Sequence, residues 1–417
     1  MSAAANSMVD ETVQRLQVAT LRQTSCIRTR ASALLVRARA GQSDYFAIAD
    51  DVAMDRTAQI VADVTRQRYG DGSIPYHSRW RHFEAGGFDR RAELDRSLGD
   101  VTVAERARAH VDLVITSVLL DAGAGPDWRY AETASGQQFV RSEGLGVASF
   151  RAFANGLFSS DPRQPFRADA AALRRLTAAQ LGAAFQVSAS NPLVGLDGRV
   201  TLLRRLGDAM ADQPGVFGTD GRPAGVFDTL TRNLTSLDAH EILWLLLTTL
   251  SDVWPAPNHV GDIPLGDCWR HAAVRGEGLS DGWMPFHKLS QWLTYSLLEP
   301  FAWAGIQVTG LSALTGLPEY RNGGLLLDTG VINTKDRASL DRTWQVGDEF
   351  IVEWRALTVA LLDELAPRVR KILGKSEPEM PLACVLEGGT WAAGRALAQQ
   401  LRGGLPPINL ASDATVF

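Results

Sequence analysis

Residues 287–297 form the first segment whose polar side chains could do chemistry. At helical spacing the segment separates into a leucine stripe and an opposite polar stripe that carries Lys288 and Gln291, with His287 beside them. Nearby tryptophan and phenylalanine residues favour a buried helix, in which a polar stripe must find partners or line a wet cavity. We therefore expect these three side chains to line a site. A solvated helix face with Lys288 in water fits the spacing equally well.

A second candidate group is Glu319, Tyr320 and Arg321, which stand between apolar runs and in front of Gly323 and Gly324. A carboxylate here could act as an acid, a base or a nucleophile, and the planar guanidinium could hold an anion. The glycines would let a ligand approach the backbone closely. The alternative is an intrachain pair between Glu319 and Arg321 in a turn.

Residues 77–82 place two histidines and two arginines around one tryptophan. His77, Arg79, Arg81 and His82 are suited to gripping a phosphate or a carboxylate, because guanidinium groups match the geometry of both anions. Arginine-rich loops also form surface salt bridges, which is the competing interpretation.

Asp121 and Trp128 flank a loop that is rich in glycine. A carboxylate and an aromatic ring in one loop could meet a sugar or a planar base. We therefore keep Asp121 as a candidate second carboxylate and Trp128 as a candidate stacking residue.

The loop over residues 259–271 contains side chains that can bind metals, namely His259, Asp262, Asp267, Cys268 and His271. No pair among them repeats a known zinc-ligand spacing, so loop residues without an ion are the favoured interpretation. Asp262 remains a candidate substrate ligand. The chain has no P-loop and no dinucleotide-binding fingerprint, which removes the usual support for nucleotide-driven chemistry.

The elements that must position these groups are mainly helices. Apolar spacing predicts helices near residues 13–18 and 27–36 and over 54–68, 103–120 and 350–373, and Asp238 with Glu241 has the spacing of a capping box at a helix start. Residues 192–223 carry several glycine and aspartate residues and are expected to be an exposed loop region. Without repeats or β-α-β alternation, the chain is expected to be mainly α with a few short strands. We expect a single catalytic unit over residues 1–417, with an N-terminal helical subregion over residues 1–100.

Composition narrows the classes of protein that the chain can belong to. The 417 residues are 45% hydrophobic and carry a net charge of -5, so neither nucleic acid nor an anionic membrane is an expected partner. Three dispersed cysteines fit a reducing compartment, and the first thirty residues carry no secretory signal. We expect a cytoplasmic enzyme that acts on a small molecule, with an oligomeric state that the sequence does not define.

Four blocks of the sequence, at residues 77–87, 287–293, 314–324 and 386–395, closely resemble the uracil-catabolism protein four family of fungi and bacteria. A fainter similarity links the chain to the queuosine-nucleotide salvage N-glycosylases. In that comparison Lys288 and Gln291 match a Lys-x-x-Gln helix, and residues 319–321 match an acidic-Tyr-Arg turn. Glu319 stands where those enzymes usually have aspartate, and residues 322–324 replace a Val-Pro sequence.

The resemblance implies a helical fold related to DNA glycosylases and a hydrolase of uracil catabolism. The implied reaction is cleavage of an N-ribosyl bond in ribosylurea or its 5′-phosphate, which gives urea and a ribose product without a metal or organic cofactor. In this interpretation Glu319 stabilises the sugar cation and Lys288 contacts the leaving group or the sugar hydroxyls. The expected substrate-binding residues are Tyr320, Arg321, His287, Gln291, His77, Arg79, Arg81, His82, Trp128 and Asp262, with Arg321, Arg79 and Arg81 on the phosphate.

Two other functions remain open at this point. One is a metal-dependent hydrolase of an opened pyrimidine ring, which would use the loop over residues 259–271. The other is a non-catalytic nucleotide-binding component of the pathway.

Overall fold

The structure is a computed structural model that describes residues 3–254 and 257–411, and it confirms a mainly helical fold. Among the described residues, strands occur only as two-stranded pairs. The chain divides into two compact units, of which unit 1 contains residues 3–77, 257–291 and 311–411, and unit 2 contains residues 78–254 and 292–310. The expectation of one catalytic unit stays a prediction, and the two ends of its range lie outside the described residues.

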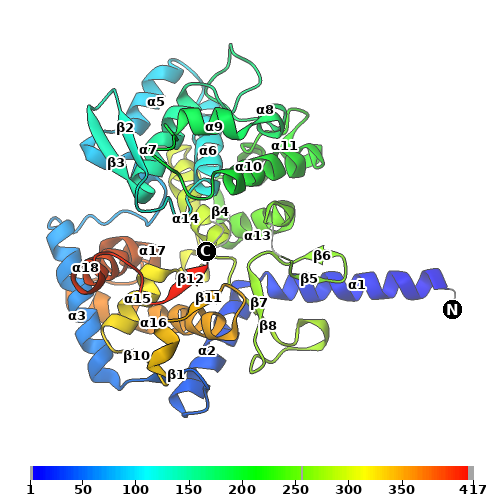
Figure 1. Ribbon diagram of the computed structural model, residues 1–417. Coiled ribbons are helices and arrows are strands. Elements are labelled where there is room, and N and C mark those ends of the chain that lie inside the picture. The colour runs from blue at the N-terminus through cyan, green and yellow to red at the C-terminus, as the bar shows by residue number, and fades with distance from the viewer. Residues whose placement is uncertain (1–2, 255–256, 412–417) are drawn as a thin grey trace. The chain divides into compact units, whose positions relative to one another are not determined.

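Unit 1 consists of long helices with short strand pairs (Figure 1). Its helices are α1 (Ala3–Leu21), α2 (Thr24–Arg39), α3 (Asp51–Arg68), the first residues of α14 (Lys288–Trp303), α15 (Tyr320–Asp328), α16 (Glu349–Leu373), α17 (Leu382–Val385) and α18 (Trp391–Arg402), with a π-helical turn at Leu386–Thr390 and 3-10 turns at Gly278–Ser280, Leu311–Ala313 and Arg337–Leu340. Its antiparallel pairs are β1 (Phe46–Ile48) with β10 (Ile332–Thr334), β5 (His259–Val260) with β6 (Ile263–Pro264), and β7 (Cys268–Arg270) with β8 (Trp283–Pro285), and its parallel pair is β11 (Thr343–Gln345) with β12 (Asn409–Ala411).

Helix α16 forms the centre of unit 1. It confirms the predicted helix over residues 350–373, and most of its first half is buried, including Leu357 and Leu361 at 0% exposure. Helices α2, α3 and α15 pack against it. Burial of these apolar faces is the main stabilising contribution expected for this unit.

The glycines after Glu319 serve helix packing. A Cβ atom on Gly323 would lie 2.7 Å from Cε2 of Trp354, and one on Gly394 of α18 would lie 2.1 Å from the carbonyl oxygen of Arg321. Helix α15 can therefore approach α16 at Gly323 and α18 at Gly394 only because these two residues have no side chain. This packing role replaces the expected role of Gly323 in letting a ligand approach the backbone.

Unit 2 contains shorter helices and two strand pairs. Its helices are α4 (Trp80–Phe83), α5 (Arg90–Leu98), α6 (Val103–Leu119), α7 (Arg141–Ala154), α8 (Ala170–Arg175), α9 (Ala178–Ala184), α10 (Leu196–Ala211), α11 (Pro214–Phe217), α12 (Gly225–Thr231), α13 (Ala239–Thr249) and the remainder of α14, with 3-10 turns at Ala85–Gly87 and Ser251–Val253. Antiparallel β2 (Arg129–Glu132) and β3 (Gln137–Val140) form one pair, and parallel β4 (Ser236–Asp238) and β9 (Gln307–Thr309) form the other. The predicted helix over 103–120 and the capping box of Asp238 and Glu241 are both confirmed.

The expected loop region over residues 192–223 is wrong, because its centre is the 16-residue helix α10. Val200, Leu203 and Leu206 recur at helical spacing and are buried, and α10 packs against α8. Gly207 permits this contact, since a Cβ atom there would lie 3.1 Å from the carbonyl oxygen of Ala170. Apolar periodicity therefore outweighs the glycine and aspartate content of this region.

Across residues 3–254 and 257–411, none of the helices combines the length and the apolar character that crossing a membrane requires.

A buried ion pair joins three parts of unit 1. Both carboxylate oxygens of Asp267 accept hydrogen bonds of 2.7 Å from the Arg355 guanidinium, and the Trp269 indole donates to Asp267 over 2.7 Å. The backbone amide of Lys288 donates to Asp267 over 3.0 Å, and Arg355 Nε donates to the carbonyl oxygen of Pro318 over 3.3 Å. The pair thus ties the start of α14 and the residue before Glu319 to α16.

Removing one charge of this pair should strongly destabilise the protein. We expect Asp267→Asn to lower the free energy of unfolding by about 3–5 kcal/mol, because it leaves the Arg355 charge buried without its counter-ion. Glu364→Gln is the control, since it breaks the exposed pair with Arg39 and should cost less than about 1 kcal/mol. Urea denaturation of both variants provides the measurement, and equal losses would contradict the structural role of the Asp267 pair.

Candidate functional site

The start of α14 has a constrained backbone. His287, immediately before Lys288, has a φ of 50°, a left-handed conformation that is uncommon for residues other than glycine. Its Nε2 donates to the carbonyl oxygen of Leu21 over 3.0 Å, and burial lowers the pKa of His287 to about 4. His287 is therefore neutral near pH 7 and holds the backbone that leads into Lys288, and its expected contact with a substrate stays a prediction.

The polar stripe of α14 is buried rather than solvated. Gln291 and Tyr295 are 0% exposed, and Lys288 is partly buried. Gln291 Oε1 accepts from the Thr315 amide over 3.3 Å, whereas its Nε2 has no hydrogen-bond partner among the described residues. Because buried amide groups are normally satisfied, this donor indicates room for a polar partner beside Lys288, one helical turn away.

Glu319 caps the amino-terminal end of α15. Its carboxylate accepts from the backbone amides of Arg321, over 2.7 Å, and Asn322, over 2.8 Å, so it is held in place by the helix that follows. The side chain is 8% exposed, and burial raises the pKa of Glu319 above its ordinary value, although the charges of Lys288 and His77 and the two amides act in the opposite direction. The charges of Lys288 and His77 therefore both act on the Glu319 carboxylate.

Glu319 contacts Arg321 through the backbone amide of Arg321 rather than through the side-chain ion pair that was the alternative for this turn. Arg321 directs its Nη1 to the carbonyl oxygen of Gly404 over 3.4 Å, and its guanidinium lies 4.6 Å from the centre of the Tyr320 ring. Tyr320 is 37% exposed, so this ring borders solvent. Asn322 is fully buried, and its Oδ1 has no hydrogen-bond partner in the described part of the chain. Among the described residues, two buried polar atoms thus lack a hydrogen-bond partner. The acceptor Asn322 Oδ1 lies close to Glu319 in the sequence, and the donor Gln291 Nε2 lies on the helix that carries Lys288.

His77 belongs to a buried network that the sequence analysis did not identify. Its Nδ1 lies 2.8 Å from Oε2 of Glu387, and Oε1 of Glu387 accepts from the Tyr69 hydroxyl over 2.8 Å and from Arg68 Nη2 over 2.7 Å. Burial alone would raise the pKa of Glu387, but the hydrogen bond from His77 and the nearby positive charges lower it to about 2. The signal available in the sequence was a single glutamate between an apolar run and a glycine pair at residues 386–389.

In unit 2, Arg79 and Asp121 form an ion pair. Arg79 is 0% exposed, its Nη1 lies 2.9 Å from Oδ1 of Asp121, and its Nε donates to the Ser117 hydroxyl over 2.7 Å. The same Nη1 lies 3.3 Å from Nδ1 of His82, and the guanidinium is 5.8 Å from the Trp292 ring centre. Burial lowers the pKa of Arg79, while Asp121 raises it. Three of the predicted residues, Arg79, His82 and Asp121, are thus brought together, with Asp121 as the counter-ion of Arg79.

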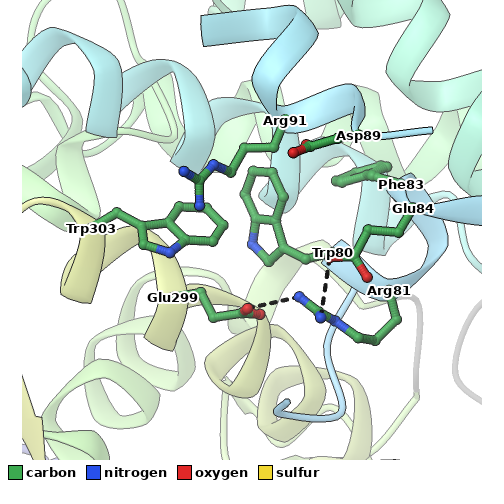
Figure 2. A pocket seen from close by; sticks show the side chains of 8 residues that line it. All are labelled: Trp80, Arg81, Phe83, Glu84, Asp89, Arg91, Glu299 and Trp303. Carbon is green, nitrogen blue, oxygen red and sulfur yellow. Dashed lines mark hydrogen bonds and ion pairs between the residues drawn. The ribbon is translucent and has the colours of Figure 1, made fainter. Parts of the chain in front are cut away.

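Arg81 lines a pocket of about 200 Å³ in unit 2 (Figure 2). Its guanidinium is paired with Glu299 at 2.7 Å and with Glu84 at 3.1 Å, and Arg91 lies 4.1 Å from the centre of the Trp303 ring on another wall. Burial raises the pKa of Glu299, while Arg81 lowers it. Because two carboxylates already compensate its charge, Arg81 would have to exchange a partner to bind a phosphate, and that role stays a prediction.

Two other predicted ligands have surroundings that do not favour a binding role. Trp128 is 0% exposed, stacks on Phe185 and donates its indole N–H to the carbonyl oxygen of Phe185 over 3.0 Å, which is the environment of a core residue. Asp262 is exposed in the turn between β5 and β6.

The loop over residues 259–271 does not assemble a metal centre. Asp267 is bound by Arg355, and His271 Nε2 lies 3.1 Å from Oε2 of Glu353. The described residues contain no group of three or more histidine, cysteine, aspartate or glutamate side chains that could hold a metal ion. Two of the five candidate donors of this loop, Asp267 and His271, therefore already have side-chain partners.

Comparison with known proteins identifies relatives over nearly the full chain. Residues 20–417 match the family described as "Protein of unknown function (DUF1688)". "Protein urg3" of Schizosaccharomyces pombe is 39% identical over 414 residues, which cover 96% of this chain and 99% of that protein. "Uracil catabolism protein 4" of Lachancea kluyveri is 37% identical over 412 residues, which cover 90% of this chain and 93% of that protein. The resemblance seen in the four sequence blocks is confirmed, and the chain belongs to the DUF1688 family.

Proposed function

We propose that this protein is a hydrolase of uracil catabolism that cleaves the N-ribosyl bond of ribosylurea or its 5′-phosphate and releases urea and a ribose product. The place in uracil catabolism is supported by the name of the Lachancea kluyveri relative, which matches most of this chain. The chemical step is supported by one observation above the others: the Glu319 carboxylate is buried and held by two backbone amides, and the charge of Lys288 favours its ionised form.

A carboxylate in this setting suits the cleavage of a glycosidic C–N bond. Positive charge develops on the ribose ring as the bond to nitrogen breaks, and a fixed anion nearby stabilises that charge most strongly where water is excluded. The amides of Arg321 and Asn322 hold the Glu319 carboxylate in place before the substrate arrives. No reorganisation energy is then needed during the reaction.

The unpaired polar atoms support a substrate with several hydrogen-bonding groups. Gln291 Nε2 is a buried donor and Asn322 Oδ1 a buried acceptor, and neither has a partner among the described residues. They lie on the two segments that carry Lys288 and Glu319, and Gln291 Oε1 joins those segments through the Thr315 amide. Ribose hydroxyls and a ureido group can both donate and accept, so either would satisfy these atoms. In this proposal Lys288 contacts the leaving group or the sugar hydroxyls.

The first test is turnover by the purified protein. Incubation with ribosylurea and, separately, with its 5′-phosphate should release urea and the corresponding sugar in equal amounts. Binding of either compound without urea release would instead favour the non-catalytic nucleotide-binding component, and release that stops after metal chelation would favour the metal-dependent alternative.

Neutralising Glu319 should abolish most of the activity while the fold persists. We expect Glu319→Gln to reduce kcat by at least about 10²-fold, because the amide keeps an oxygen for the helix cap but not the negative charge. Urea release under saturating substrate measures the effect, and thermal unfolding checks the fold.

Glu319→Asp is the matched variant for that test, since it keeps both the charge and the capping group and should retain more activity than Glu319→Gln. Near-native turnover by Glu319→Gln would remove the carboxylate from the mechanism.

Removing the Lys288 charge should shift the pH dependence of the reaction. The active form requires ionised Glu319, whose pKa burial raises, so kcat/KM should fall as the pH decreases through that raised pKa. Lys288 lowers the pKa of Glu319, and Lys288→Met should therefore move this acidic limb to higher pH. Lys371→Met, at an exposed position on α16, should leave it in place. An unchanged limb, or a shift to lower pH, in Lys288→Met would contradict the coupling.

A further inference from the structure

Cleavage of the C–N bond needs a proton for the departing nitrogen, because a urea anion is a poor leaving group. In the reaction proposed above, Glu319 stabilises the sugar cation and Lys288 contacts the leaving group or the sugar hydroxyls, and the transfer of this proton is assigned to neither. The buried network around His77 offers a group suited to it, since imidazole can donate and accept protons near neutral pH.

Glu387 determines which nitrogen of His77 can exchange a proton with a substrate. Its pKa of about 2 keeps the carboxylate ionised, and an ionised carboxylate only accepts hydrogen bonds. The contact of 2.8 Å therefore requires that Nδ1 of His77 carries a hydrogen. Because Nδ1 is engaged by Glu387, a proton transferred to a substrate would come from Nε2.

The Glu387 carboxylate is itself fixed from two directions. Tyr69 and Arg68, at the end of α3, hold its second oxygen, and Glu387 lies in the π-helical turn between α17 and α18. That turn packs on α3 so closely that a Cβ atom on Gly389 would lie 2.3 Å from the carbonyl oxygen of Val61. Single π-helical turns are uncommon and occur frequently at functional sites. The histidine is thus oriented by a rigid anion rather than by a mobile surface group.

His77 also acts on Glu319. Its charge lowers the pKa of Glu319, which places the imidazole and this carboxylate in one electrostatic environment within unit 1. Glu387 contacts the imidazole and is itself bound by Arg68, while Glu319 is influenced by both His77 and Lys288.

We propose that His77 is the general acid of the reaction and that Glu387 is its positioning residue. This inference rests on the proposed function and deepens it. As the bond between C1′ and nitrogen breaks, its electron pair stays with nitrogen, and Nε2 of the imidazolium supplies the proton that makes the leaving group neutral urea. Water adds to C1′ of the sugar cation and loses one proton, which restores the imidazolium. The balance is one ribosylurea and one water consumed, and one ribose and one urea formed.

The test compares two leaving groups in His77→Asn. The asparagine amide can keep a donor toward Glu387, but it has no group that replaces Nε2 as an acid. We expect urea release from ribosylurea to fall by about 10²–10⁴-fold. Hydrolysis of 4-nitrophenyl ribofuranoside, whose leaving group departs without a proton, should stay within a few-fold of the native rate.

Glu387→Gln provides a second variant in case His77→Asn does not fold. It should lose activity selectively on ribosylurea, because the anion that orients the His77 imidazole is gone. Glu353→Gln is the matched control, since it alters another buried histidine–glutamate pair of unit 1 and should not change the ratio of the two rates.

Equal losses on both substrates in His77→Asn and Glu387→Gln would overturn the acid role while leaving the proposed function intact. Absence of urea release by the native protein would be a different result, and it would remove the proposed function and this inference together.

Discussion

The buried ion pair of Asp267 and Arg355 is the interaction on which the candidate site depends. Asp267 accepts from the amide of Lys288, and Arg355 donates to the carbonyl oxygen of Pro318, so a single pair fixes the residue that starts α14 and the residue that precedes Glu319. Burying two charges costs several kcal/mol per ion unless their partners satisfy them well. Here the two hydrogen bonds between the side chains, with the Trp269 indole, meet that requirement. The pair therefore holds the start of α14 and the residue before Glu319, which are separated in the sequence, in a fixed arrangement.

Charge compensation differs between the two units. In unit 2, Arg79 is paired with Asp121, and Arg81 is paired with Glu299 and Glu84, so both arginines have neutralising carboxylates. In unit 1, burial raises the pKa of Glu319, while backbone amides and the charges of Lys288 and His77 favour the ionised form. A carboxylate whose environment is balanced in this way is typical of a functional site. Arginine pairing of the kind seen in unit 2 also occurs for purely structural reasons.

Much of the fold was predictable because it follows local patterns. Apolar spacing identified the central helix α16, and the capping box at Asp238 identified the start of α13. The same reasoning failed over residues 192–223, where glycine and aspartate content masked the apolar spacing of α10. Lys288 and Glu319 could be singled out as candidates because each lies in a segment with a clear polar pattern, and their roles stay predictions. The role of Glu387 could not be predicted, because its partners Arg68 and Tyr69 lie at the end of α3 and directly after it, more than three hundred residues earlier. Burial of Trp128 against Phe185 likewise depends on tertiary packing that no local pattern encodes.

The central claim is that the anion at position 319 stabilises positive charge on a bound ribose. Isothermal titration calorimetry with an iminoribitol, a ribose analogue that is cationic at neutral pH, tests it most directly, because transition-state analogues bind more tightly than ground-state ligands. The account predicts that the native protein binds this cation at least about 10²-fold more tightly than neutral ribose, and that Glu319→Gln removes the difference. Equal affinity of the native protein for the two compounds would contradict it.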